Sequence, residues 1–327
     1  MTCGLGPVNE RMEPFFTRRR RLPEDHPAFA GLPVSHITLK DARTRAAVHV
    51  RGAFGRGRMP LVCLAGYHRN MSDFAALVDN FQRLGRGNWP LVLIDLPGRG
   101  RADDRPKSMQ YSTLTDAGDV ADILSALGIG RAVLLGQGHG GQVIMALAAQ
   151  HPLLIGGTIL LDAGPMPDSR GIVRLRNNLA HLESLRGSKA VTAGFRRMLA
   201  GDYPGLSEAE LDALALRSHW FDKRGRPRAL FDSRLIAQIR DINFDDILVA
   251  QWPLFEALGC APLMLLRTQL TDQVRRETFE DMLRRRPDAV ALTIQGQGSP
   301  ALLDEQTDIE AVAEFVFHTG EGARRVA

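Results

Sequence analysis

The stretch Leu134-Leu-Gly-Gln-Gly-His-Gly-Gly141 decides which fold we expect for this chain of 327 residues. Within it glycine occupies every second position from Gly136 to Gly140, and apolar residues at helical spacing follow as far as Gln150. Because glycine has no Cβ atom, two backbone segments can approach each other closely at such positions. The pattern therefore predicts a buried strand that turns sharply into a helix packed against it.

The alternation of strand and helix patterns extends along most of the chain. Residues 36–39 and 46–51 flank a turn at 41–43 and predict an antiparallel pair. Apolar runs bounded by glycine and proline predict buried strands at 61–65, 91–95, 131–135, 158–162, 263–267 and 290–294. Helical periodicity predicts helices at 72–84, 115–127, 141–150, 271–286 and 304–317. This order predicts an α/β protein with a mostly parallel central sheet flanked by helices.

Residues at the ends of two predicted helices mark their boundaries. Ser72 and Thr115 are the expected N-caps, because their short side chains can accept a hydrogen bond from the first helical turn. Gly85 and Gly128 are the expected C-terminal stops.

The strand pattern lapses between about residues 164 and 246. Helical patterns at 172–185 and 208–216 replace it, so we expect a mostly helical insertion that lines a pocket and excludes water. The chain is accordingly divided into an N-terminal arm (1–33), a core (34–163 and 247–327) and a helical cap (164–246).

Composition excludes several classes of protein. With 44% hydrophobic and 24% charged residues, the chain is not disordered, collagen-like or a disulfide scaffold. No apolar stretch reaches the ~20 residues of a membrane span, and we expect a cytoplasmic protein that does not bind membranes. A net charge of +4 indicates no nucleic-acid ligand. The basic run at 18–21 either touches an anionic surface or is a solvated arm.

Cofactor and metal sites are not expected. Cys63 and Cys260 lie in or beside apolar runs and are interpreted as buried, inert thiols. His, Cys and Asp residues do not cluster at metal-ligand spacing, and no phosphate-binding glycine motif follows a strand.

Four pieces of the sequence together resemble the α/β-hydrolase superfamily, in its capped form. They are LVCLAGYHRN at 61–70, IDLPGRG at 94–100, LLGQGHGG at 134–141 and LRTQLTD at 266–272. The pieces occur in the family's order, and the resemblance covers about residues 34–317. It implies an α/β-hydrolase fold with a helical cap inserted after the sixth strand.

The resemblance also implies that two members of a catalytic triad are replaced. The family carries a serine nucleophile in a G-x-S-x-G turn, followed along the chain by an acid and a histidine. Gly138 stands at the position of the serine, Asp272 at that of the acid and Ser299 at that of the histidine. Loss of the nucleophile or the histidine typically lowers kcat by ~10⁶-fold. Ordinary serine-hydrolase turnover is therefore not expected.

The family's oxyanion hole maps to the backbone amides of Tyr67 and His139, which side-chain replacement leaves intact. These donors lie near a helix N-terminus, which favours a carbonyl or a carboxylate. The rings of His139 and His68 either move protons or are ordinary loop side chains. The Tyr67 hydroxyl either orients a ligand or walls the pocket, and Asp272 is either a relic paired with water or an arginine, or a working base.

These observations lead to three functional hypotheses. The first is a non-hydrolytic pseudo-hydrolase that binds a small-molecule carbonyl or carboxylate ligand. The second is an enzyme of another class, a lyase, isomerase or cyclase, in which His139, His68 or Tyr67 acts beside the retained oxyanion hole. The third is a weak ester hydrolase. A structural or partner-binding role, in which the fold is only a platform, is a further alternative, and a homo-oligomer is compatible with all of them.

Overall fold

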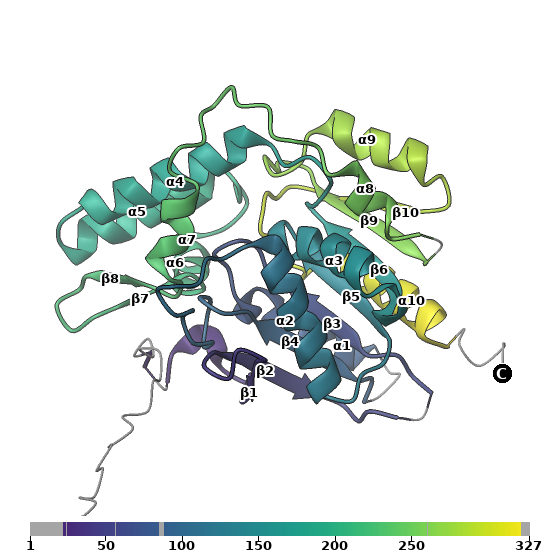
Figure 1. Cartoon of the computed structure of the whole chain (residues 1–327). Coiled ribbons are helices and arrows are strands. Elements are labelled where there is room, and N and C mark those ends of the chain that lie inside the picture. The colour runs from purple at the N-terminus through teal and green to yellow at the C-terminus, as the bar shows by residue number, and fades with distance from the viewer. Residues whose placement is uncertain (1–21, 24, 56, 85–87, 260, 322–327) are drawn as a thin grey trace, which may run out of the picture.

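The computed structural model describes residues 22–23, 25–55, 57–84, 88–259 and 261–321 (Figure 1). The basic run at 18–21, most of the expected N-terminal arm, Gly85 and Cys260 therefore lie outside the described residues. Cys63 lies within them: it is a free thiol, fully buried, and burial raises its pKa.

The centre of the molecule is an eight-stranded sheet in the order β1-β2-β4-β3-β5-β6-β9-β10. Strands β1 and β2 pair antiparallel, β2 pairs antiparallel with β4, and the remaining neighbours are parallel. Its strands are β1 (Ser35–Thr38), β2 (Arg45–Arg51), β3 (Leu61–Leu64), β4 (Leu91–Asp95), β5 (Ala132–Gln137), β6 (Ile155–Leu161), β9 (Leu263–Thr268) and β10 (Val290–Ile294). The predicted α/β fold with a mostly parallel sheet is confirmed.

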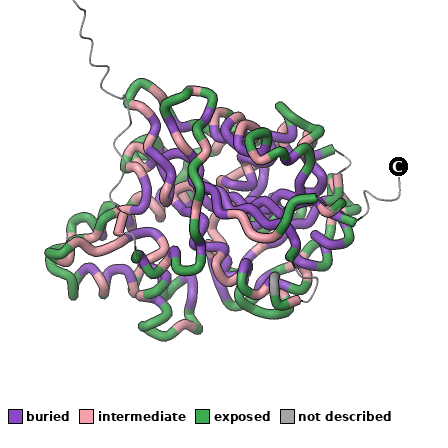
Figure 2. Tube along the Cα trace, turned by 90° about the horizontal axis from the view of Figure 1, so that it is seen from below, coloured by how far each residue is buried: buried purple, intermediate pink, exposed green. Residues whose placement is uncertain are grey.

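Helices cover both faces of this sheet (Figure 1). They are α1 (Ala75–Arg83), α2 (Thr113–Ala126), α3 (His139–Gln150), α8 (Trp252–Glu256), α9 (Arg276–Arg285) and α10 (Gln306–Glu321). Alternate residues of each strand feed opposite cores. In β5, Val133 and Leu135 pack with α1 and α10, whereas Ala132 and Leu134 pack with the other helices. Figure 2 shows the resulting buried centre of the chain.

Two predicted helix boundaries were wrong in detail. The N-cap of α2 is Ser112, whose side chain accepts a hydrogen bond from the Thr115 amide, so Thr115 lies inside the first turn. Ser72 lies within a short 3₁₀ helix, η2 (Met71–Phe74), that Asn70 caps before α1 begins. Gly128 does follow α2, with a φ of +68°.

The segment between β6 and α8 is mostly helical, as predicted. It contains α4 (Ser169–Ser184), α5 (Ser188–Ala200), α6 (Glu208–Leu216) and α7 (Ser233–Gln238). These helices share a core of their own around Phe195, Tyr203 and Leu235. A small hairpin of β7 (His219–Phe221) and β8 (Pro227–Ala229), which the sequence analysis did not predict, lies between α6 and α7. The boundaries 164 and 246 for a separate cap stay a prediction.

The insertion is joined to the core by main-chain hydrogen bonds at the loop that follows β4. The Gly100 amide donates to the Leu230 carbonyl at 2.7 Å, and the Asp232 amide donates to the Gly98 carbonyl at 2.8 Å. Where the insertion ends, the Gln251 amide donates to the Pro165 carbonyl at 2.7 Å, which brings its two ends together.

Glycine is required at two positions of the turn between β5 and α3. A Cβ atom on Gly140 would lie 2.2 Å from the Leu64 carbonyl oxygen, and one on Gly136 would lie 2.4 Å from the Gly141 nitrogen. Both contacts are with backbone, which cannot move aside as a flexible side chain could. The start of α3 therefore packs directly on the end of β3.

We expect Gly140→Ala to lower the free energy of unfolding by about 1–3 kcal/mol, because the added methyl group overpacks this contact. Gly118→Ala in α2 is the matched control. A Cβ atom there meets nothing within 4 Å, and alanine in a helix interior should add about 0.5–1 kcal/mol. Thermal or urea unfolding of both variants measures the effect, and equal stabilities of the two variants would contradict the packing argument.

Candidate functional site

Gly138 occupies the sharp turn between β5 and α3. It is the N-cap of α3 with φ 52° and ψ −114°, a backbone conformation that is strained for any residue with a side chain. Its amide donates to the Leu161 carbonyl at 2.9 Å, which fixes the turn on β6. A Cβ atom at Gly138 would have the Gln273 Oε1 atom as its nearest neighbour, at 4.0 Å. A side chain at this position would therefore project into open space.

The space beside Gly138 is a cavity with two compartments. The larger one has a volume of about 400 Å³ and the smaller one about 110 Å³. Both are lined by Tyr67, Gly138, His139, Gly171, Leu175 and Gln273. Both compartments combine apolar and polar lining residues: Ile172 and Asp116 are examples in the larger one, and Leu199 and Gln137 in the smaller one. A ligand of mixed polarity matches such a lining.

The two residues whose backbone amides are expected at an oxyanion hole, Tyr67 and His139, both line this cavity. Tyr67 follows β3, and His139 is the first residue of α3. Within the described chain, neither amide donates a hydrogen bond to another residue. The rings of the two residues meet edge to face with centroids 5.2 Å apart. Two unused donors and the positive end of α3 suit an oxygen that carries negative charge.

The Tyr67 side chain reaches across to the insertion. Its hydroxyl donates to the Leu235 carbonyl at 3.0 Å and lies 3.3 Å from the Gln238 side-chain oxygen. The Tyr67 carbonyl accepts a hydrogen bond from Arg99 Nε at 2.7 Å. The hydroxyl is thus engaged by α7, and the ring forms part of the cavity wall.

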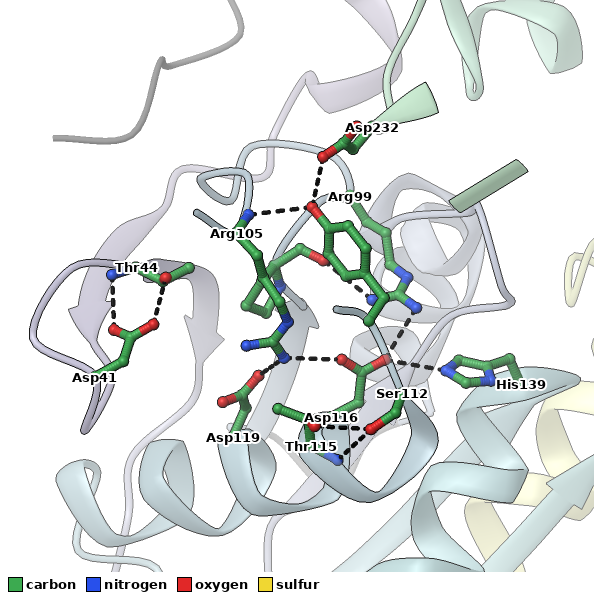
Figure 3. A network of polar contacts seen from close by, with 12 residues as sticks. Asp41, Thr44, Arg99, Arg105, Ser112, Thr115, Asp116, Asp119, His139 and Asp232 are labelled. Atoms are coloured by element: carbon green, nitrogen blue, oxygen red, sulfur yellow. Dashed lines mark hydrogen bonds and ion pairs between the residues drawn. The ribbon is translucent and has the colours of Figure 1, made fainter. Parts of the chain in front are cut away.

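The His139 ring is held by a buried carboxylate, which Figure 3 shows at the centre of a charge network. His139 Nε2 lies 3.0 Å from Asp116 Oδ2, and Arg99 Nη2 lies 2.9 Å from the same oxygen. Arg105 Nη2 contacts the other oxygen, Oδ1, at 3.0 Å and also pairs with Asp119.

These contacts keep Asp116 ionised. Burial alone would raise its pKa, but the Arg99 guanidinium, the His139 hydrogen bond and Arg105 outweigh burial and hold the pKa well below its usual range. An ionised carboxylate only accepts hydrogen bonds, so His139 donates to it from Nε2. For neighbouring Asp119, by contrast, burial raises the pKa to about 7.

His68 belongs to a different environment. Its ring packs edge to face on Phe231, which also contacts His219, and it lines the smaller compartment. Burial, together with the charge of Arg69, holds the pKa of His68 well below its usual value and lowers that of His219 to about 3. Both rings are therefore neutral near pH 7, and Arg99 of the network around His139 also contributes to lowering the pKa of His68.

Ser299 lies in the smaller compartment beside a carboxylate. Its hydroxyl hydrogen bonds to Asp162, which follows β6 with a φ of +48°. Asp162 also accepts from the Thr268 amide at 2.7 Å and the Thr268 hydroxyl at 2.8 Å. Burial raises the pKa of Asp162 to about 6 despite these hydrogen bonds. Neither the pairing of Ser299 with Asp162 nor the burial of this carboxylate was predicted from the sequence.

Asp272 does not line the cavity beside Gly138 but contacts Gln273, which does. Its carboxylate pairs with Arg174 Nε of α4 and accepts from Gln273 Nε2 at 2.9 Å, and it lines an open surface hollow. Arg174 also contacts Asp202 at 2.8 Å. Of the residues singled out in the sequence, the structure thus gathers Tyr67, Gly138 and His139 at the larger compartment. His68 and Ser299 share the smaller one.

Two polar residues of the site were missed by the sequence analysis. Asp116 belongs to no recognisable motif in the sequence of α2. Only its helical spacing from the buried residues Val120 and Ile123 could have indicated that it faces inward. Gln137 is the last residue of the apolar strand β5 and precedes the turn at Gly138. A polar residue at that point could have been noted from the sequence as a candidate site residue.

No metal or membrane-spanning feature accompanies this site in the described part of the chain. Among those residues, no group of three or more His, Cys, Asp or Glu side chains is placed to hold a metal ion. No helix that the structure describes has the length and apolar character needed to cross a membrane.

The sequence pattern of the Alpha/beta hydrolase family matches residues 61–315, most of the chain. The chain belongs to the Alpha/beta hydrolase family. The same fold is seen in the crystal structure of an alpha/beta hydrolase from Novosphingobium aromaticivorans. That protein is 27% identical, with a TM-score of 0.73 over 88% of this chain and 98% of the other. E-2-(acetamidomethylene)succinate hydrolase, at 20% identity and a TM-score of 0.68, shares the fold, covering 88% of this chain and 99% of that chain.

Sequence relatives within the family are hydrolases by name. A 2-hydroxy-6-oxononadienedioate/2-hydroxy-6-oxononatrienedioate hydrolase of Burkholderia vietnamiensis is 30% identical over 39% of this chain. The match spans 44% of that protein, less than half its length. A 2-(acetamidomethylene)succinate hydrolase of Mesorhizobium japonicum is 25% identical over 74% of this chain and 82% of its own length.

We expect Asp116→Asn to lower the free energy of unfolding by about 3–5 kcal/mol near neutral pH, because it leaves Arg99 buried without its carboxylate and Arg105 with Asp119 alone. The pKa of Asp116 is lower in the folded chain than in the unfolded chain. Its contribution to the free energy of unfolding is therefore fully present above the unfolded-state pKa of ~3.9 and is lost as the pH falls through the folded-state pKa. The difference between wild type and variant should therefore shrink below about pH 4.

Urea unfolding at a series of pH values measures this difference. Asp79→Asn is the control, since Asp79 is 65% exposed and its pair with Arg51 should contribute less than about 1 kcal/mol. A difference for Asp116→Asn that does not change with pH would show that the carboxylate charge is not what stabilises the network.

Proposed function

We propose that this member of the Alpha/beta hydrolase family binds a small carbonyl or carboxylate compound without covalent catalysis. The observation that carries the proposal is the open turn at Gly138: the backbone has the strained form of a nucleophile turn, and no side chain occupies the space beside it. The unused amides of Tyr67 and His139 support binding of a carbonyl oxygen at the same place.

The remaining positions support a binding role over serine hydrolysis. In the resemblance to the family, Gly138 and Ser299 stand for the nucleophile and the histidine. Ser299 hydrogen bonds to Asp162, and the Asp272 carboxylate is paired with Arg174 and does not itself line the cavity. Without an attacking group and its base, the retained donors favour a bound carbonyl but provide no acyl-enzyme.

The names of the relatives agree with the proposed ligand chemistry. Each of the two hydrolases named above acts, by its name, on a carboxylic acid that bears a further carbonyl group. We propose that the helical segment 164–246 acts as a cap over this cavity, since Ile172, Leu175 and Ile239 of that segment line it. A cytoplasmic location and the oligomeric state stay predictions.

Calorimetry against matched acids, primary amides and methyl esters, among them derivatives of 4-phenylbutanoic acid, tests the proposal. We expect at least one set to bind wild type, and Gly138→Phe to abolish that binding because the ring fills the space beside the turn. Gly138→Ala, which has the same backbone strain but leaves most of the space open, should retain it.

The methyl esters provide the second readout of the same experiment. Wild type should release no acid above the buffer rate, and a fluorophosphonate should label nothing at position 138. Ester cleavage that Gly138→Phe abolishes would favour the weak ester hydrolase instead. Binding that Gly138→Phe leaves unchanged would place the ligand elsewhere and contradict the proposal.

The Asp116–His139 hydrogen bond favours one alternative function. A histidine whose Nε2 is held by an ionised carboxylate has Nδ1 as its other ring nitrogen, an arrangement suited to a general base. Beside two amide donors, it could remove a proton next to a bound carbonyl while the amides stabilise the enolate. This is the chemistry of an isomerase or lyase, and it needs no reactive side chain at position 138.

Proton exchange tests this alternative. If it holds, the protein should speed the exchange of the α-protons of 5-phenyl-2-pentanone in D₂O, which proton NMR follows directly. His139→Gln and Asp116→Asn should each lower that rate by about 10²–10⁴-fold. His151→Gln, at the exposed far end of α3, is the control. Equal rates in wild type and His139→Gln would remove this function.

A further inference from the structure

The side chain of Gln273 borders the space beside Gly138 with its carbonyl oxygen. Gln273 lies in the loop between β9 and α9 and lines both compartments of the cavity. Its Oε1 atom lies 4.0 Å from the position that a Cβ atom on Gly138 would take. Within the described chain, no group donates a hydrogen bond to this oxygen. Gln273 is partly exposed, and Oε1 is not among the fully buried polar atoms that lack a partner, so a ligand can reach it.

The other end of the same amide is fixed by a carboxylate. Gln273 Nε2 donates to Asp272 Oδ1 at 2.9 Å, and Asp272 Oδ2 pairs with Arg174 Nε of α4. A carboxylate has only acceptor atoms, so the NH₂ group of Gln273 has to face Asp272. The carbonyl oxygen is therefore the end of the amide that is left for the cavity.

The backbone of this loop is also held in place. The Gln273 carbonyl accepts from the Asp168 amide at 3.0 Å, and the Gln273 amide donates to the Thr271 hydroxyl oxygen at 3.1 Å. Helix α4 packs closely on the loop, since a Cβ atom on Gly171 would lie 2.4 Å from the Asp272 carbonyl oxygen. Gln273 Oε1 is thus a preorganised acceptor, which binds a donor at a lower cost in entropy than a mobile side chain would.

We propose that Gln273 Oε1 accepts a hydrogen bond from an N–H group of the ligand, on the atom next to the carbonyl that the amides of Tyr67 and His139 bind. The His139 amide belongs to the peptide bond that follows Gly138, so this donor and Oε1 border the same position. A carboxamide carries a carbonyl oxygen and an N–H group on neighbouring atoms, and it pairs with both.

This acceptor selects against other carbonyl compounds. A carboxylate or an ester has an oxygen without a proton where the carboxamide has its N–H group, so it leaves Oε1 unpaired and places a second acceptor against it. The inference rests on the proposed function and narrows its ligand class from carbonyl and carboxylate compounds to carboxamides that carry an N–H group.

Two ligands that differ in one group test the inference. N-methyl-4-phenylbutanamide has an N–H group where methyl 4-phenylbutanoate has an ester oxygen, and their shapes are otherwise alike. In calorimetry, wild type should bind the amide more tightly. In Gln273→Leu, which has a similar shape and no acceptor, this preference should fall about 10-fold without weaker binding of the ester. Differences in hydration between the two ligands cancel in this comparison of ratios.

Gln142→Leu is the matched control. Gln142 lines the larger compartment only, so this variant should keep the preference of wild type. Binding of the ester by Gln273→Leu as tightly as by wild type shows that the variant is folded and its cavity intact.

Asp272→Ala tests whether the carboxylate orients the Gln273 amide. Without Asp272, the amide is free to turn its NH₂ group toward the cavity, where it donates to an ester oxygen. The preference for the amide should then fall, and the ester should bind more tightly than to wild type. A merely structural role of Asp272 would instead weaken both ligands alike, and that result would overturn the positioning role.

The outcomes separate this inference from the proposed function. A preference for the amide that is the same in wild type and Gln273→Leu overturns the role of Gln273. The proposed function then stands if Gly138→Phe abolishes binding of either ligand. If wild type binds neither ligand, nor any of the acids and primary amides of the sets above, both proposals are overturned.

Discussion

The contact between the first turn of α3 and the end of β3 is the constraint on which the site depends. The absence of a Cβ atom on Gly140 lets α3 start directly against the Leu64 carbonyl. This packing brings the loop that carries Tyr67 next to the amide of His139. It also forces Gly138 into a backbone conformation from which a side chain would point into the cavity. The geometry of the turn is thus set by packing between backbones, independently of whether a reactive group is present.

A second constraint is the buried charge of Asp116. The carboxylate of this residue in α2 joins Arg99 from the loop after β4 to His139 at the start of α3. The same loop pairs through its backbone with residues 230 and 232 of the insertion. The ionised Asp116 therefore links helices α2 and α3 to the loop after β4 and, through that loop, to the insertion. Its stabilisation depends on excluding water from the whole network, because the same contacts are weak when solvated.

The sequence predicted the fold well and the site only in part. Strand positions could be predicted from short apolar runs between glycines and prolines. Parallel strands are buried on both faces, so their residues are nearly all apolar. Tyr67, Gly138 and His139 were placed together because they belong to one local turn and the loop beside it. Asp116 was missed because its role depends on contacts with distant segments, Arg99 after β4 and His139 in α3. The hairpin at 219–229 was missed because its strands are only three residues long.

The turn at Gly138 also bears on how such a protein can change over generations. Because glycine at a positive φ already adopts the torsion angles that a serine would need there, the surrounding structure requires no rebuilding to accept one. A glycine codon that ends in a pyrimidine becomes a serine codon by exchange of its first base. If the codon for Gly138 is of this kind, one base exchange would place a hydroxyl at the point where β5 meets α3 without rebuilding the turn.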